Sequence, residues 1–376
     1  MRFDRREAAG AVADVGVLVP IAAALIIKNG LAATAVLLPA ALLYLVVAFA
    51  FRLPIPVQPL KAFGAIAIAM GLGASEIAAG SLLMGAIFLL LGATGLIDLA
   101  GRAFPKPLIR GVQLTVGLLF LKIAWGLVWD APTSFTDASA DPLVLLALTL
   151  VVLGAAFALR RHMVSLVLVL AGLAIALVRA GGEMKLGPSA IPLPEFDAAV
   201  FASAMVALVI PQLPLTFANS CLATADAARG YFGEKANRVK PGRLAMTLGG
   251  ANLLAGGIAG MPVCHGAGGL TAHERFGARS GGAPLMMGTA LLVAALVLGA
   301  GLAALLTAFP LPILAGLLAA AGLLHIGLLR DLEGWQQWAI ALLIGAIGFG
   351  LNLAIALAVG LVAWWLPVAV RRLRER

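Results

Sequence analysis

Residues 54–64 read PIPVQPLKAFG and interrupt a chain that is otherwise rich in long apolar runs. Three prolines within six residues leave backbone carbonyls without helical partners. In a membrane, such backbone is tolerated only where it is buried in protein or lines a water-filled cavity. A helix begins beyond the last proline, at Leu60 and Lys61, and its first N–H groups are unpaired and carry partial positive charge. The stretch therefore predicts a half-helix whose positive end lies inside the membrane.

The composition supports a membrane location for this stretch. The chain has 376 residues, of which 62% are hydrophobic and 11% are charged, and its mean hydropathy is +1.07. A soluble globular protein carries about 25% charged residues, so this chain cannot cover a water-facing surface. A disordered chain and a nucleic-acid-binding module are excluded by the same values. Apolar runs of about 20 residues recur along the whole length, which predicts an all-α polytopic membrane protein.

We expect fourteen membrane segments when the apolar runs are divided at turns and charge clusters. They cover residues 11–28, 31–51, 57–73, 76–99, 107–129, 141–159, 162–180, 197–223, 241–260, 263–277, 283–308, 310–329, 334–351 and 353–370. The third and the tenth are short and are opened by proline or glycine. We expect these two to be half-helices.

Lysine and arginine gather in alternate turns of this arrangement. Arginines precede the first segment, and cationic residues follow every even-numbered segment from the fourth onward and end the chain. The turns of the other side hold only Lys28, Arg179 and Lys185 as cations. The positive-inside rule then predicts that both termini lie in the cytoplasm and that the protein crosses the cell (inner) membrane many times. The net charge of +9 thus reflects membrane topology and does not indicate a nucleic-acid partner.

The two halves of the chain echo each other. Residues 17–20 (VLVP) correspond to residues 208–211 (LVIP), and the proline-rich run at 53–59 corresponds to residues 260–266 (GMPVCHG). Each half contains seven segments. Because seven is odd, the second half enters the membrane in the opposite orientation, so we predict an inverted repeat of seven plus seven segments.

The second interrupted segment, GMPVCHGAGG at 260–269, ends in small residues that let a ligand approach the backbone closely. If both segments are broken helices, their N-termini face each other near the middle of the bilayer. Two opposed positive ends without intervening carboxylates form an anion site. The alternative is that each motif is a kink or a packing contact between helices.

Three residues of these motifs have two interpretations each. Lys61 adds a full positive charge if its side chain points inward, but it can also extend to the inner membrane surface. His265 is either a residue of the site or a hydrogen-bonded core imidazole. Cys264 is either in contact with the ligand or a small buried filler. The chain has two cysteines, Cys221 and Cys264, in apolar surroundings, so we expect no disulfide framework and no metal cluster.

Polar residues also recur on one face of the segment 197–223. Gln212, Thr216 and Asn219 follow the spacing of one helix face, and such a stripe faces a partner helix or a cavity. We assign Gln212 to the site, whereas Thr216 and Asn219 fit interhelical hydrogen bonds or substrate contact. Asp14 is the carboxylate of the first segment, which indicates either an ion or proton pathway or a role at the helix end.

The interrupted segments, together with residues 212–220 and 275–281, closely resemble the molybdate transporter family related to sulfate permeases. The resemblance implies molybdate uptake and the fold of the sulfate-permease and nucleobase-transporter superfamily. In that fold, two half-helices frame the substrate, and the chain divides into a core domain and a gate domain. Dimers are common among such proteins, so a homodimer is one expected assembly.

The resemblance also implies domain boundaries. The core domain would comprise residues 1–104 and 191–308, and the gate domain would comprise residues 105–190 and 309–376. Sulfate permeases of the wider superfamily usually append a cytoplasmic regulatory domain after the last helix. Because this chain ends at residue 376, we expect no such domain.

The expected mechanism is alternating access for a tetrahedral divalent oxyanion, bound by backbone N–H groups of both interrupted segments. The expected substrate-binding residues are Val57, Gln58, Lys61, Gln212, Thr216, Asn219, Cys264, His265, Gly266 and Ala267. Uptake of a dianion against an inside-negative potential costs about 2.3 kcal/mol per charge per 100 mV. Uptake therefore needs a coupled cation; protons are the natural choice, with Asp14 or His265 as the carrier. No cofactor is expected.

Other functions remain as alternatives. A transporter of sulfate or another oxyanion would use the same helix dipoles. A nucleobase transporter would need carboxylates in the eighth and tenth segments, which the motifs around Gln212 and Cys264 do not supply. A hydrolase that pairs Cys264 with His265 is disfavoured, because adjacent residues on a helix point about 100° apart, so we expect no enzyme activity. A passive channel would show flux that does not respond to a proton gradient.

Overall fold

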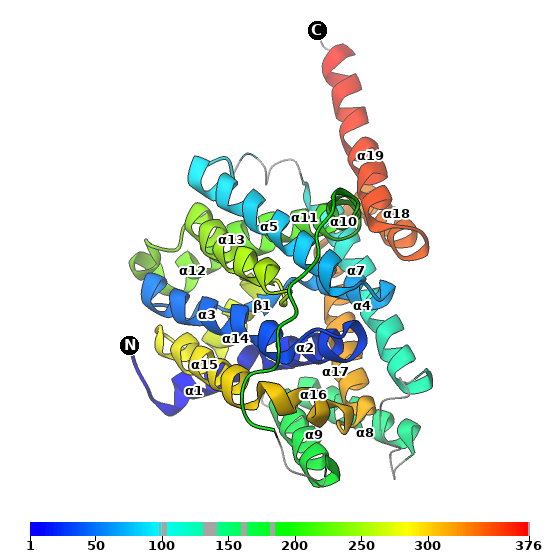
Figure 1. The fold of residues 1–376 in the computed structure, drawn as a ribbon. Helices are drawn as coiled ribbons and strands as arrows, with labels where there is room; N and C mark the ends of the chain where they lie inside the picture. The colour runs from blue at the N-terminus through cyan, green and yellow to red at the C-terminus, as the bar shows by residue number, and fades with distance from the viewer. Residues whose placement is uncertain (98, 100–103, 131–140, 159–163, 181–184, 375–376) are drawn as a thin grey trace.

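A computed structural model describes residues 1–97, 99, 104–130, 141–158, 164–180 and 185–374 of the chain. The regular secondary structure of the described residues is helical apart from one pair of two-residue strands (Figure 1). Seven of the described helical stretches are long and apolar enough to cross a membrane. A helix overlaps each of the fourteen expected segments, with ends that differ by a few residues, although the boundaries expected at 159 and 162 lie outside the described residues.

The elements of the first half follow the predicted order. They are α1 (Arg5–Ala11), the 3-10 turn η1 (Val12–Asp14), α2 (Val15–Asn29), α3 (Ala33–Phe51), β1 (Gln58–Pro59), α4 (Lys61–Met70), α5 (Ala74–Thr94), α7 (Lys106–Trp129), α8 (Pro142–Ala158) and α9 (Val164–Ala180). The first helix begins earlier than residue 11, because the Asp4 carboxylate accepts hydrogen bonds from the backbone N–H groups of Arg6 and Glu7 and caps α1.

The second half repeats the pattern with one long compound helix. Its elements are α10 (Ala198–Ala204), η2 (Met205–Val209), α11 (Ile210–Leu215), η3 (Thr216–Ala223), α12 (Thr224–Phe232), η4 (Gly233–Ala236), α13 (Pro241–Gly257), β2 (Val263–Cys264), α14 (Ala267–Arg275), α15 (Gly282–Val293), η5 (Ala294–Leu298), α16 (Gly299–Thr307), α17 (Leu311–Gly327), η6 (Leu328–Asp331), α18 (Gly334–Gly350) and α19 (Leu353–Arg374). The turns η2 and η3 are π-helical and flank Pro211 and Pro214, which lack the N–H group that a regular helix needs.

The two interrupted segments meet in the interior of the protein. Strands β1 and β2 pair antiparallel, with Gln58 opposite Cys264 and Pro59 opposite Val263. A further backbone hydrogen bond of 3.0 Å runs from the Leu60 nitrogen to the Pro262 oxygen. The expected half-helices begin just after the strands: the ten residues of α4 span about 15 Å and the nine of α14 about 13.5 Å. Each is half the thickness of a bilayer core, about 30 Å.

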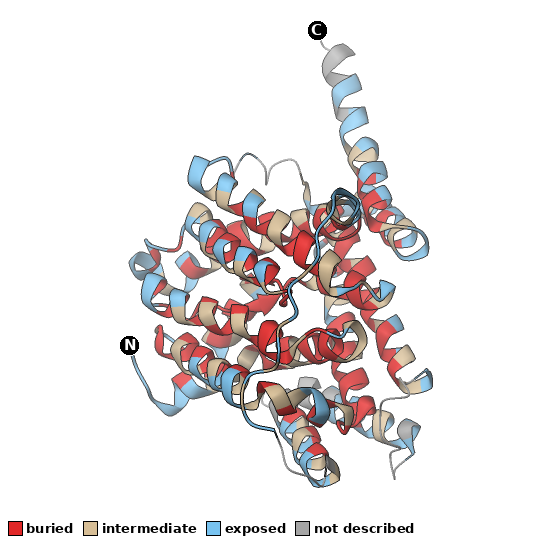
Figure 2. Cartoon of the chain, in the orientation of Figure 1, coloured by how far each residue is buried: buried red, intermediate tan, exposed pale blue. Residues whose placement is uncertain are grey.

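The helices form two visibly different groups. Helices α3, α5, α13 and α15 pack in one stack, and α7 and α17 form a pair that runs at a steep angle to it (Figure 1). Buried residues gather around β1 between these groups, and α19 extends away from the rest of the protein (Figure 2). The interior of the protein therefore holds the site where the helices are broken.

Glycines allow α5 and α13 to approach closely. A Cβ atom added at Gly249 would lie 2.8 Å from the Leu89 nitrogen and 3.0 Å from the Gly85 oxygen, so a larger residue cannot fit without a shift of backbone. A Cβ added at the neighbouring Gly250 would meet no atom within 4 Å. This contact is the close packing of small residues that membrane helices use in place of the hydrophobic effect.

We predict that Gly249→Ala lowers the thermal unfolding midpoint of the purified protein in detergent. Overpacking at a backbone contact costs about 1–3 kcal/mol. The matched variant Gly250→Ala replaces a glycine in the same helix where there is space, and it should be neutral or stabilising by about 0.5–1 kcal/mol. Equal midpoints for the two variants would contradict the packing of α5 against α13.

Candidate functional site

A cavity of about 740 Å³ lies between the half-helices, the compound helix around α11 and the pair α7 and α17. Its wall includes the polar residues Asp14, Gln58, Lys61, Gln212 and Asn219. Cys264 and Ala267 also line it, followed by Gly268 and Gly269 at the start of α14. The cavity therefore brings together residues from both halves of the chain.

Gln212 holds the N-terminal end of α4. Its side-chain oxygen accepts a hydrogen bond of 3.0 Å from the backbone nitrogen of Phe63, one of the N–H groups that a helix leaves unpaired in its first turn. Its side-chain nitrogen donates to the Thr216 hydroxyl at 3.0 Å. Gln212 therefore lines the cavity and caps α4 at the same time.

Asn252 of α13 holds β2 from the other side. Its amide nitrogen donates to the Val263 oxygen at 2.9 Å, and its amide oxygen accepts from the Val263 nitrogen at 2.7 Å. The fully buried side chain thus pairs with β2 as a neighbouring strand would. These two bonds complete the pairing of backbone that would otherwise be exposed to an apolar interior.

Asp14 lies at the centre of a buried hydrogen-bond network. Its carboxylate is 1% exposed and accepts hydrogen bonds from the Tyr44 hydroxyl at 2.8 Å, from the Gln58 amide and from the His273 Nε2 at 2.8 Å. A buried charge is tolerated when such donors satisfy it. Lys61 extends the network, because its ammonium group donates to the Gln58 oxygen at 2.6 Å.

This network resolves two of the open interpretations. Lys61 lines the cavity and contacts Gln58, so its charge lies inside the protein rather than at the membrane surface. Asp14 precedes α2, but its side chain makes no capping hydrogen bond to that helix. Asp14 therefore stands at the start of α2, but its side chain points to the buried network rather than capping that helix.

Four of the expected residues are not part of the cavity wall. Val57 is buried beside β1, and the Thr216 hydroxyl bonds within its own helix to Gln212. The imidazole of His265 is held by the Pro56 oxygen at Nδ1 and the Thr247 hydroxyl at Nε2, both at 2.9 Å. His265 thus has the contacts expected of a hydrogen-bonded core imidazole, because its ring pairs with the interrupted backbone and Thr247.

Gly266 has a packing role next to the cavity. A Cβ added there would lie 2.8 Å from the Gln58 side-chain oxygen and 3.3 Å from the Asn219 side-chain nitrogen. Both of these side chains line the cavity. The absence of a side chain at 266 therefore lets Gln58 and Asn219 take their places on the wall.

Sequence reasoning missed His273 and Tyr44, which both bond Asp14. Tyr44 is a single hydroxyl within the long apolar segment 31–51, and a polar group there needs a buried partner. That was an available signal. His273 gave none, because it lies near the end of a short polar helix, where a solvated histidine is equally compatible with the sequence. The Nδ1 atom of His273 is buried and has no hydrogen-bond partner among the described residues.

The charge on the wall favours an anion. Asp14 is the one carboxylate among the described residues that line the cavity, and three donors satisfy it. Lys61 adds positive charge to the wall, and Lys106 and Arg110 also line it, where both pair with Asp331 of η6. No group of three or more metal-ligating side chains occurs within the part of the chain that the structure describes.

A family model described as a molybdate transporter of the MFS superfamily matches residues 6–120 and 204–324. The chain is 29% identical to molybdate transporter 1 and to molybdate transporter 2 of Arabidopsis thaliana, over 94% and 96% of its length and 86% of each relative. It is 28% identical to molybdate transporter 1 of Chlamydomonas reinhardtii, over 95% of its length and 90% of that relative.

Solved anion transporters have a similar fold. The transmembrane domain of the cyanobacterial bicarbonate transporter BicA superposes with a TM-score of 0.65 at 18% identity, over 96% of this chain and 98% of that chain. SLC26A9 superposes with a TM-score of 0.70 at 16% identity, over 97% of this chain and 65% of that chain. At these identities the likeness shows the fold, and the all-helical polytopic fold expected from the motifs is confirmed.

We predict that Asn252→Ala loosens β2. The variant leaves the buried N–H and C=O groups of Val263 unpaired, at about 1–3 kcal/mol for each group. Hydrogen–deuterium exchange of the peptide that covers residues 258–266 should increase, and the unfolding midpoint should fall.

The control is Asn352→Ala, which removes the cap of α19 at a cost of about 1 kcal/mol. It should leave exchange at residues 258–266 unchanged. Unaltered exchange in Asn252→Ala would show that the asparagine does not hold the strand.

Proposed function

The chain belongs to the molybdate transporter family and is a transporter rather than an enzyme, and we propose that it binds the tetrahedral oxyanion beside the paired starts of α4 and α14. One observation carries the proposal: the antiparallel pairing of β1 with β2 sets both helix N-termini next to one cavity that Lys61 also lines. The binding residues expected from the sequence then act in two ways. Those on the wall contact the anion, and His265, Thr216 and Gly266 position them.

The two helix ends have different roles in this proposal. The N-terminus of α4 is capped by Gln212, whereas no described side chain accepts a hydrogen bond from the N–H groups of Ala267, Gly268 and Gly269. A Cβ added at Gly268 would meet no atom within 4 Å, which leaves room for a ligand. The open amide groups of α14 therefore receive the oxyanion oxygens.

The positive charge around this position matches a dianion. Each helix N-terminus contributes the equivalent of about half an elementary charge. Together with the ammonium group of Lys61, the two ends provide about two positive charges. Asp14 would offset part of this charge unless His273, which bonds its carboxylate, is protonated; Tyr44 and Gln58 stabilise the carboxylate as neutral donors.

Transport would proceed by alternating access. The core domain (residues 1–104 and 191–308) carries the half-helices, the gate domain (residues 105–190 and 309–376) carries α7 and α17, and the cavity lies between them. Its mouth is at Lys106 and Arg110, in one of the turns rich in cations. If both termini lie on the cytoplasmic side of the cell membrane, the cavity opens to the cytoplasm. The inverted repeat would then allow a second conformation in which the cavity opens to the outside.

Proton coupling would use Asp14 together with His273. Import of a dianion against the membrane potential costs about 2.3 kcal/mol per charge per 100 mV and therefore needs a driving ion. The side-chain amide of Gln58 donates to Asp14 and accepts from Lys61. Protonation of the Asp14–His273 pair would therefore alter the hydrogen bond that holds Gln58, and through Gln58 the position of the Lys61 ammonium group beside the anion. His265 becomes a less suitable carrier than the sequence suggested, because both of its ring nitrogens hold the backbone and Thr247. The homodimer stays a prediction.

We predict that Lys61→Gln weakens the equilibrium binding of labelled molybdate about tenfold or more. The loss of a charge-assisted contact inside the protein costs about 1.5–3 kcal/mol. Lys28→Gln, at the end of α2 and outside the cavity wall, makes the same change of charge and should bind as the unmodified protein does.

Competition with sulfate tests the substrate in the same assay. Excess sulfate should displace molybdate only weakly from the unmodified protein. Displacement of molybdate by an equal concentration of sulfate would instead indicate a transporter of several oxyanions. Equal molybdate affinity of the Lys61→Gln and Lys28→Gln proteins would refute the proposed anion position.

We predict that Asp14→Asn and His273→Gln each abolish the stimulation of molybdate uptake by an inward proton gradient in proteoliposomes. Neither variant keeps the carboxylate–imidazole pair that would hold the proton. The measured quantity is the ratio of uptake with and without the gradient, normalised to reconstituted protein, because loss of one partner of a buried pair also lowers stability.

His325→Gln is the matched control for this ratio. His325 lines the cavity, but its Nδ1 faces the Ala321 oxygen rather than a carboxylate. This variant should keep the response to the gradient. Persistence of the response in both Asp14→Asn and His273→Gln would exclude the pair as the proton carrier.

A further inference from the structure

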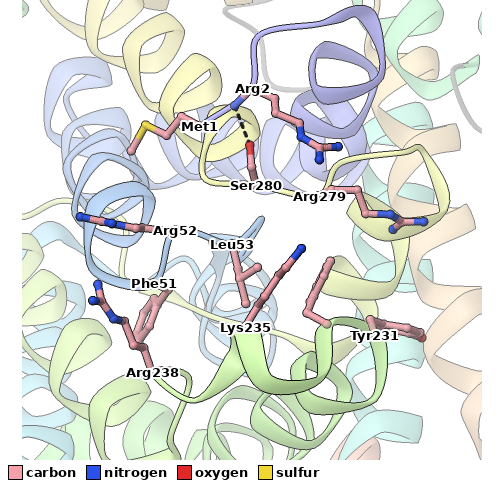
Figure 3. Close-up of a pocket in the computed structure, with 11 residues that line it drawn as sticks. Met1, Arg2, Phe51, Arg52, Leu53, Tyr231, Lys235, Arg238, Arg279 and Ser280 are labelled. Carbon is pink, nitrogen blue, oxygen red and sulfur yellow. Dashed lines mark hydrogen bonds between the residues drawn. The ribbon is translucent and has the colours of Figure 1, made fainter.

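A second cavity, of about 750 Å³, shares no lining residue with the cavity beside α4 and α14, which is called the transport cavity below. The end of α3, the α12–η4 region, the loop between α14 and α15 and the N-terminal residues form its wall. The basic pocket is defined here by Arg2, Arg52, Lys235, Arg238, Arg279 and Ser280 (Figure 3). We propose that the basic pocket binds a ligand that carries phosphate groups, independently of the transported anion.

The pocket has a large excess of positive charge. Five cationic side chains line it, and its wall contains no aspartate or glutamate among the described residues. Arg279 pairs with Glu274 at 2.6 Å, but the described part of the chain offers no ion pair to the other four. Like charges gathered in a concave surface raise the local potential and attract a multivalent anion.

The side chains surround an open space. In Figure 3, Lys235 extends toward the region between Leu53 and Ser280, the guanidinium groups of Arg52 and Arg238 lie on one side, and Arg279 lies on the other. These residues come from chain segments that are far apart in the sequence. The convergence of charge is therefore a product of the fold and not of one basic run.

Arg52 occupies a costly position. It ends α3 in the left-handed conformation, with φ of 57°. The corresponding residues that end α2, α4 and α5 are all glycines: Gly30, Gly71 and Gly95. Glycine adopts this conformation without the steric cost that a side chain brings. An arginine at this position therefore places a guanidinium group at the pocket despite its backbone cost.

Phosphate is the group that fits these donors. Guanidinium groups bind phosphate oxygens through two parallel hydrogen bonds, and ammonium groups add point charge. Four unpaired cations exceed the charge of a single dianion, so a ligand with two phosphate groups matches better. A pair of phosphate groups occurs both in a lipid headgroup and in a soluble diphosphate.

The surroundings favour the lipid. Val46 and Phe49, which are 50% and 60% exposed, lie on the outer face of α3 and lead to Arg52. Acyl chains can follow this apolar face while the headgroup enters the pocket. Basic pockets beside membrane helices bind diphosphate lipid headgroups such as that of cardiolipin.

The test measures binding of two probes to the full-length protein in the presence of saturating molybdate, which occupies the transport cavity. One arm titrates cardiolipin into the detergent-solubilised protein and counts bound lipid by native mass spectrometry, with phosphatidylcholine as the neutral comparison. The other arm titrates inorganic pyrophosphate by calorimetry. The variant Arg52→Gln/Lys235→Gln should weaken binding of the preferred probe about thirtyfold, from the loss of two cationic contacts.

The matched control is Lys240→Gln/Arg243→Gln. These two residues are exposed, lie near the pocket in sequence and are absent from its wall, so the variant makes the same change of charge. It should bind as the unmodified protein does, and both variants should keep their affinity for molybdate and their unfolding midpoint without ligand. Binding of cardiolipin but not pyrophosphate identifies a lipid site, and the reverse identifies a soluble ligand. Binding of neither probe, or equal weakening in both variants, would overturn the proposal.

Discussion

The structure depends on how two pieces of non-helical backbone satisfy each other inside a membrane. A bilayer offers no water to unpaired N–H and C=O groups, so the breaks at 53–60 and 258–266 need partners within the protein. They obtain them from the β1–β2 pairing, from the Leu60 to Pro262 bond, and from the side chains of Asn252 and His265. The same pairing sets the N-terminal ends of α4 and α14 beside one cavity, so the contacts that satisfy the broken backbone also form the proposed anion site.

A buried carboxylate needs hydrogen-bond donors around it. Asp14 has three, Tyr44, Gln58 and His273, which come from α3, β1 and α14. Gln58 joins this network to Lys61 at the cavity. One amide side chain, that of Gln58, therefore links the carboxylate of Asp14 to the ammonium group of Lys61.

The two cavities differ in their charge balance. In the cavity beside α4 and α14, Lys61 lies near the carboxylate of Asp14, and Lys106 and Arg110 pair with Asp331. In the basic pocket, four cations have no counter-charge among the described residues, which suits tighter and longer occupation by a more highly charged ligand. Tyr231 of the basic pocket contacts Thr271 of the transport cavity at 3.0 Å, so the two walls are joined through α12 and α14.

The sequence by itself determined the all-helical polytopic membrane class, the two interruptions before α4 and α14 and the family, because hydropathy, proline placement and motif order are local properties of the chain. It also singled out Asp14, Gln58, Lys61 and Gln212. Only the tertiary structure decided the partners: His273 rather than His265 faces Asp14, and Thr216 bonds within its own helix. The physical reason is that helical spacing defines which face a residue occupies, whereas the group that it meets depends on contacts between segments hundreds of residues apart, such as the 259 positions between Asp14 and His273.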